Sequence, residues 1–111
     1  MVALTAPSKN DPMRTAAKVD TTQRSIVRAL REAGISVFVL REGRGIPDLL
    51  ASYRGYVCCI ECKTGNGKPN ELQRQFREGF QGSVIVTNNP EEAVSKFFLE
   101  YSCALLGRVL R

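Results

Sequence analysis

Three side chains able to do acid, base or metal chemistry, Asp48, Glu61 and Lys63, lie in two short apolar runs of the sequence. The runs are joined by Arg54-Gly55, and an X-Gly pair between such runs is typical of a β-hairpin. Counting outward from a two-residue loop pairs Tyr53 with Tyr56, Ser52 with Val57 and Leu50 with Cys59. The same count places Asp48 opposite Glu61, so the two acids are predicted to be neighbours across the hairpin.

The predicted pairing brings two negative charges together on one face of the hairpin. Side chains alternate between faces along a strand, so Lys63 shares this face with Glu61. Opposed residues have β-carbons about 4.5–5.5 Å apart, and two carboxylates at that separation repel each other. A positive group is expected between them, and the candidates are Lys63 and a divalent cation with hard oxygen ligands.

Apolar residues accompany the acids on both faces of the hairpin, so both faces are expected to be largely buried. Burial penalises a carboxylate unless it is paired or bound to metal, and we therefore interpret the two acids as functional. The structural alternative is a carboxylate and lysine ladder on a solvated strand end.

The rest of the chain offers few other catalytic groups. The sequence has no histidine, which excludes a histidine-based nuclease mechanism, and no serine or cysteine has the base partner that nucleophilic hydrolysis requires. Cys59 and Cys62 have the spacing of a redox or zinc pair, but three residues along a strand put their thiols on opposite faces. We interpret the four cysteines as small buried hydrophobes. The glycine-rich segment 64–69 lacks the Walker A spacing, so no small-molecule cofactor is expected.

Length and charge favour one small domain with an acidic partner. The chain has 111 residues and a formal net charge of +5 at pH 7, a balance that favours nucleic acid. The sequence contains neither an apolar run of the roughly 18 residues that a membrane span needs nor the opening of a signal peptide, so we expect a cytoplasmic protein without membrane contact. Residues 1–19 are predicted to be a flexible basic arm, and residues 20–111 the folded domain.

The first element expected to position the acids is an amphipathic helix over residues 20–34. Asp20 as N-cap with Gln23 three residues later is a capping-box pattern. Gln23 also lies on the inward stripe of this helix, which makes it a candidate site residue. The outward side of the helix carries Arg24, Arg28 and Arg31.

A loop between the first strand and the hairpin is expected to bring basic groups to the acids. Residues 35–40 are β-branched and aromatic, which predicts a strand, and residues 41–45 then form a glycine-containing loop. The loop would deliver Arg41 and Arg44 next to Asp48, where arginines suit phosphate contacts. A solvated turn without a role is the alternative.

The second half of the chain predicts a helix, a strand and a final helix. The first of these helices spans residues 70–79, with Asn70 as N-cap and Gln73 at the capping-box position, and Gln73 is also a candidate site residue. Its expected inward residues are Leu72, Phe76 and Phe80, and a phosphate track is predicted from Lys68, Arg74 and Arg77. A strand over residues 83–87 and a helix from Asn89-Pro90 complete the order α-β-β-β-α-β-α. This order is typical of an α/β fold with a mixed sheet of about four strands flanked by helices.

The acids and their neighbours form a known motif. Pro47-Asp48, a gap and then Glu61-Cys62-Lys63 resemble the PD-(D/E)xK nuclease signature. The string Gly-Ile-Pro-Asp-Leu-Leu over residues 45–50, together with Gln73-x-x-Phe76, resembles the stand-alone VRR-NUC nucleases common in phages. The resemblance covers roughly residues 20–92 and implies a restriction-endonuclease-like core.

The resemblance also implies roles for the candidate residues. Asp48 and Glu61 would be metal ligands, with the main-chain carbonyl of Cys62 as a third. Lys63 would orient or help to deprotonate the attacking water and steady negative charge. Gln73 corresponds to the helix glutamine of the family, and Gln23 stands where many relatives carry a glutamate on the first helix.

By this resemblance the protein is expected to be a Mg²⁺-dependent DNA endonuclease, with Mn²⁺ as a possible substitute. Paired incisions on branched or junction DNA by a homodimer are expected, in the host cytoplasm if the protein is phage-encoded. The alternatives are a general nickase or flap-type nuclease and a non-catalytic DNA-binding module that kept the fold. An RNA-binding accessory protein is a further alternative, which only the basic charge favours.

Overall fold

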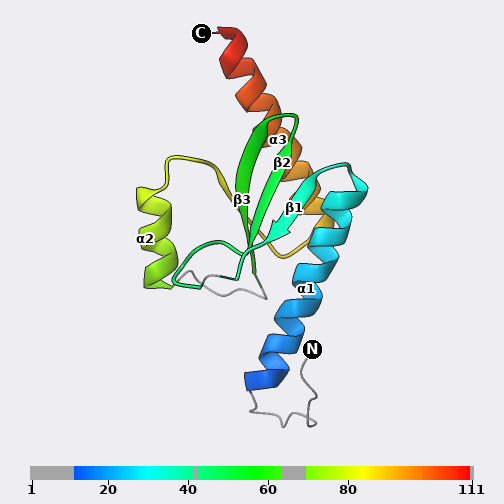
Figure 1. Ribbon diagram of the computed structural model, residues 1–111, viewed down its shortest axis with the longest axis vertical. Coiled ribbons are helices and arrows are strands. Elements are labelled where there is room, and N and C mark those ends of the chain that lie inside the picture. Colours follow the sequence, from blue (N-terminus) through cyan, green and yellow to red (C-terminus); the bar gives the residue numbers. More distant parts are fainter. Residues whose placement is uncertain (1–11, 42, 64–69, 111) are drawn as a thin grey trace.

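The computed structural model describes residues 12–41, 43–63 and 70–110, with side chains described from residue 21 to residue 108 within these ranges. Its elements are α1 (Pro12–Glu32), β1 (Ser36–Val39), β2 (Leu49–Tyr53), β3 (Tyr56–Cys62), α2 (Glu71–Gly79), β4 (Val84–Thr87) and α3 (Pro90–Leu110). This is the predicted α/β order, and Figure 1 shows the sheet with helices around it. Among the described helices, none combines the length and apolar character that a membrane span requires.

The four strands form one mixed sheet in the order β1-β2-β3-β4. β1, β2 and β3 are antiparallel neighbours, and β4 lies parallel to β3. The predicted hairpin register is confirmed in the pairs Tyr53 with Tyr56, Ser52 with Val57 and Leu50 with Cys59. Arg54 and Gly55 both have positive φ, at 49° and 83°, as a tight two-residue hairpin turn of type I′ requires.

One face of the sheet is covered by α1 and α3. The sheet residues of this face are apolar and buried, and they form a single core with Ile26 and Leu30 of α1 and Phe97 of α3. The aromatic ring of Tyr53 meets the edges of Phe98 and Tyr101 on α3, with ring centroids 5.2 and 5.1 Å apart. Together with the contact of Tyr56 on Phe97, these contacts fix β2 and β3, the strands of the hairpin, against a packed layer.

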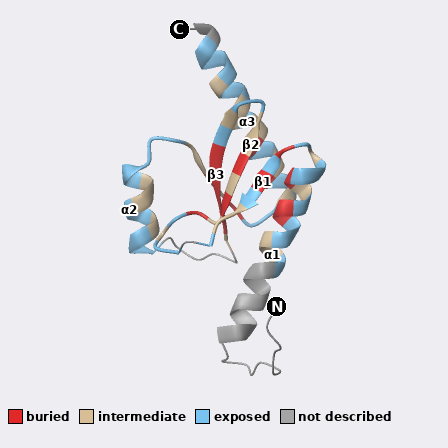
Figure 2. Cartoon of the chain, viewed as in Figure 1, coloured by how far each residue is buried: buried red, intermediate tan, exposed pale blue. Residues whose placement is uncertain are grey.

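The opposite face of the sheet is open, which corrects the expectation that both faces of the hairpin are buried. Phe38 is 63% exposed and Val57 52% exposed on this face, although Cys59 and Glu61 are buried. The face is open because α2 stands beside the sheet and does not lie across it (Figure 2). No residue of α2 is itself buried.

The apolar side of α2 is consequently not turned into a core, and the prediction of inward side chains is wrong for Leu72 and Phe80, whereas Phe76 is half-buried. Leu72 is 50% exposed and Phe80 37% exposed. Phe76 and Phe80 stack on each other instead, with ring centroids 4.9 Å apart. A stripe of apolar residues shows that a helix has an apolar side, but it does not show which surface covers that side.

The first helix begins earlier than predicted. α1 starts at Pro12, so Asp20 lies within the helix and is not its N-cap, and the predicted capping box with Gln23 is wrong. Proline is favoured at the first helical position, and the following Ala16-Ala17-Lys18 are strong helix formers. The predicted boundary between residues 19 and 20 therefore falls inside α1, and residues 1–11 of the predicted arm lie outside the described residues.

Candidate active site

The two predicted acids meet where β2 begins and β3 ends. Asp48 immediately precedes β2, and the register that pairs Leu49 with Ile60 places it opposite Glu61. The main chain of Asp48 is fixed by β1, because its carbonyl accepts a hydrogen bond of 2.7 Å from the N–H of Leu40. Its side chain is fixed by β3, because Oδ2 accepts a hydrogen bond of 2.8 Å from the N–H of Cys62.

Pro47 explains why the Asp48 side chain takes this position. Continuing the β2 and β3 ladder would place Pro47 opposite Cys62, and proline has no N–H to donate. The ladder therefore ends here, and the N–H of Cys62 is satisfied by the Asp48 carboxylate. The Cys62 carbonyl receives no ladder donor from Pro47, which keeps it available as the main-chain ligand that the motif implies.

Glu61 is buried, with 7% of its surface exposed, and Gln73 of α2 holds it in place. The Nε2 of Gln73 donates a hydrogen bond of 2.7 Å to Oε2 of Glu61. The other amide atom of Gln73, Oε1, accepts from the N–H of Asn70 at 3.0 Å, and the Gln73 N–H donates to Oδ1 of Asn70 at 2.8 Å. Gln73 thus completes the predicted capping box of α2 and contacts the site with the same side chain.

Gly45 lets α2 stand close enough for this contact. Its φ is +82°, and a Cβ at this position would lie 2.3 Å from the carbonyl carbon and oxygen of Leu72 and 2.7 Å from the nitrogen of Gln73. The loop before β2 therefore presses directly on the first turn of α2, which only glycine permits. The sequence showed a glycine-containing loop there, but it did not indicate that a helix of the same chain would lie against it.

Burial raises the pKa values of both acids, and the charge of Asp48 raises that of Glu61 further. Burial is the main cause at Asp48, where the hydrogen bond from Cys62 opposes it. The pKa of Glu61 is raised to about 7 by burial and by the Asp48 charge, against the lowering effect of Arg77 and Lys63. The two carboxyl groups lie close enough to share a hydrogen bond. An added positive charge beside these carboxyl groups would favour their ionised forms.

Two basic side chains face this acid pair. Lys63 is half-buried directly after β3, and its N–H donates a hydrogen bond of 2.8 Å to the carbonyl of Thr87 on β4. Arg77 lies in the last turn of α2 and is also half-buried. One of its guanidinium nitrogens, Nη2, is buried and has no hydrogen-bond partner among the described residues. A buried donor of this kind is rare unless a ligand, an ion or a water completes it. No sequence pattern indicated that this side chain would be buried.

Among the described residues, no hydrogen bond joins the remaining predicted site residues to Asp48 or Glu61. Arg41 and Arg44 are exposed on the loop after β1, close in sequence to Asp48. Arg74 is exposed on α2 and forms ion pairs with Glu71 and Glu78. Gln23 is half-buried on α1, and within the described residues no hydrogen bond joins it to either acid. Lys68 lies outside the described residues.

The donor set limits what the site can hold. Within the described ranges, no three or more histidine, cysteine, aspartate or glutamate side chains form a metal-binding group. The described cysteines are free, and burial raises the pKa of Cys58 and Cys62 to about 12, so these thiols are protonated and weakly nucleophilic at neutral pH. What the site offers is two carboxylates beside a main-chain carbonyl, a sparse set of hard oxygen donors.

Comparison with known proteins gives one informative match. No family model matches the chain, and no curated protein does. A solved structure described as "VRR_NUC domain" is similar in sequence and in fold, with 31% identity and a TM-score of 0.60. The match covers 76% of this chain and 97% of that structure.

Proposed function

The chain belongs to the VRR-NUC domain family of nucleases, and on that basis we propose that it is a divalent-metal-dependent endonuclease that hydrolyses phosphodiester bonds in DNA. The observation that carries the proposal is the acid pair. Asp48 and Glu61 are adjacent, their pKa values are raised, and each has one carboxylate oxygen held by an N–H donor. Such a pair is stable as two carboxylates only when a cation offsets their repulsion.

The residues of the site fit a hard divalent cation. Asp48 and Glu61 would hold it with their oxygens, and the Cys62 carbonyl would be the third protein ligand. Mg²⁺ prefers few carboxylates and keeps several waters, so the sparse donor set suits it, with Mn²⁺ as a substitute. A bound cation of this kind supplies a water of lowered pKa and neutralises charge on a phosphate.

The chain's own side chains account for the other requirements of hydrolysis. Gln73 keeps the Glu61 carboxylate in one orientation through its hydrogen bond of 2.7 Å. Lys63, two residues after Glu61 on the same side of the strand, would orient the attacking water by a hydrogen bond and steady negative charge on the phosphate. Arg77, whose guanidinium lowers the pKa of Glu61, offers positive charge beside the acids to the scissile phosphate.

We place the substrate among branched DNAs and the active form as a homodimer. One set of acids per chain cuts one strand, so symmetric paired incisions need a second copy related by a twofold axis. Leu99, Leu105 and Leu106 support this assembly, because they are 62%, 41% and 59% exposed on the C-terminal part of α3. That part of α3 extends beyond the sheet, where a second chain can approach it (Figure 1).

The test is cleavage of labelled four-way junction, linear duplex and single-stranded DNA with Mg²⁺, with Mn²⁺ and with chelator. We expect symmetric, metal-dependent incisions in the junction, a loss of at least about a thousandfold in the Asp48→Ala and Lys63→Ala proteins, and no loss in the matched exposed-acid control Glu91→Ala. Single nicks or cuts at flaps would replace the resolvase assignment with a nickase or flap-type nuclease. Binding of DNA without cleavage of any substrate would overturn the catalytic proposal in favour of a DNA-binding module.

A further inference from the structure

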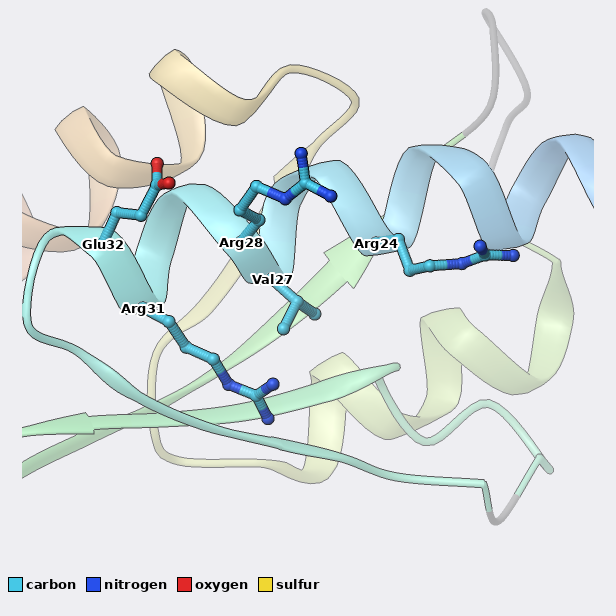
Figure 3. Close-up of a pocket in the computed structure, with 5 residues that line it drawn as sticks. All are labelled: Arg24, Val27, Arg28, Arg31 and Glu32. Atoms are coloured by element: carbon cyan, nitrogen blue, oxygen red, sulfur yellow. The ribbon is translucent and has the colours of Figure 1, made fainter.

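A row of three arginines runs along the exposed part of α1, with Arg31 turned toward β1. Arg24, Arg28 and Arg31 are exposed at helical spacing, and together with Val27 and Glu32 they line an open hollow of about 470 Å³ (Figure 3). Val27 also belongs to the core, whereas the arginine side chains are exposed, so the row is not part of the core packing.

The charge of this row is not neutralised by the fold. Within the described side chains, no ion pair joins any of the three arginines to an acid, and Glu32 is the one acid that lines the hollow. Arg31 has a structural contact, because its Nη2 donates a hydrogen bond of 2.8 Å to the carbonyl of Val37. Arg24 and Arg28 make no such contact among the described residues and are available to an anionic partner.

The row leads toward the acid end of the sheet. α1 is followed after a short turn by β1, which runs back along it, and the end of β1 meets Asp48 through Leu40. The helix rises about 12 Å between Arg24 and Glu32. β1 advances about 10 Å from Ser36 to Val39, so Arg24 lies near the level at which β1 ends.

From this placement we propose that Arg24 and Arg28 bind backbone phosphates of a double-stranded arm that extends from the cleavage site along α1. Four residues of helix rise about 6 Å, comparable with the roughly 7 Å over which one strand of duplex advances by two nucleotides. Single strands are usually held by stacking on aromatic side chains, and no aromatic residue lines the hollow. The inference rests on the proposed function, since it names the form of DNA that the same site receives.

The test is the salt dependence of DNA binding by the full chain in chelator, measured by the fluorescence anisotropy of a labelled duplex. The variant is Arg24→Gln with Arg28→Gln. Its matched control is Arg54→Gln with Arg108→Gln, which removes the same charge from the exposed hairpin tip and from the C-terminal part of α3. Arg31 is left unchanged because of its contact with Val37.

We expect the Arg24 and Arg28 variant to bind the duplex about tenfold more weakly at moderate salt, and its slope of log affinity against log salt to be shallower by about 1.8. Equal slopes in the variant and its control would overturn the inference, and so would an equal loss on a single-stranded oligonucleotide. The readout needs neither metal nor cleavage. Failure of the wild-type protein to cut DNA would therefore remove the proposed activity and leave this result to be judged separately.

Discussion

The face of the sheet that carries Val37, Ala51 and Cys58 is covered by two helices, whereas the face that carries Glu61 is largely uncovered. On the covered face, residues from all four strands and two helices share one apolar core. On the open face, α2 reaches the site through the close approach of Gly45 and the hydrogen bond of Gln73 to Glu61. The comparison indicates that stability depends mainly on one face and chemistry on the other.

The largest effect is expected from the covered face. Phe97→Ala removes a fully buried ring and should lower the free energy of unfolding by about 3–5 kcal/mol, because it leaves a cavity in the core. Phe38→Ala removes the same kind of ring from the open face, where Phe38 is 63% exposed. This substitution should lower the free energy of unfolding by less than about 1 kcal/mol. Denaturant unfolding measures both values. Similar losses in the two variants would show that the open face is covered in solution.

A smaller effect on stability and a clear effect on activity are expected at the contact between the loop and α2. Gly45→Ala forces a Cβ against the backbone of Leu72 and should displace α2, so that Gln73 no longer holds Glu61 and cleavage falls at least tenfold. Gly43→Ala is the matched control, because its φ is also positive but nothing lies within 4 Å of the added Cβ. Both carry a backbone penalty of about 1–2 kcal/mol. Equal activities in the two variants would exclude a role of this contact in positioning the site.

The smallest effect is a dependence of stability on pH that originates in the acid pair. The pKa of Glu61 is about 7 in the folded chain, above the ordinary value of 4.5, so the folded state holds this proton more tightly than the unfolded state does. In chelator, the melting temperature should therefore fall as pH rises from about 5 to 8, and Mg²⁺ should restore it at the upper end. Glu61→Gln should remove this part of the dependence, and the exposed control Glu91→Gln should keep it. A melting temperature that rises over this range in the wild-type protein alone would contradict the raised pKa.

The sequence predicted those parts of the site that local geometry determines. The hairpin register follows from the two-residue turn, and the capping box of α2 follows from the spacing of Asn70 and Gln73, so both could be read before the structure was known. The placement of α2 could not be predicted from the sequence, because an apolar stripe does not indicate which surface covers it. The start of α1 was missed for a related reason: residues 12–19 lack an apolar period, yet helix propensity continues through them.

The two-residue turn at Arg54-Gly55 constrains how this hairpin can change in evolution. Asp48 and Glu61 are separated from the turn by equal numbers of residues, and both must stay opposite each other and off the core face. One residue inserted into a single strand would move its acid to the wrong face, although no site residue had changed. Lengthening that keeps the site requires two residues in each strand at once. Homologous hairpins that retain both acids should therefore differ in length by paired, even steps.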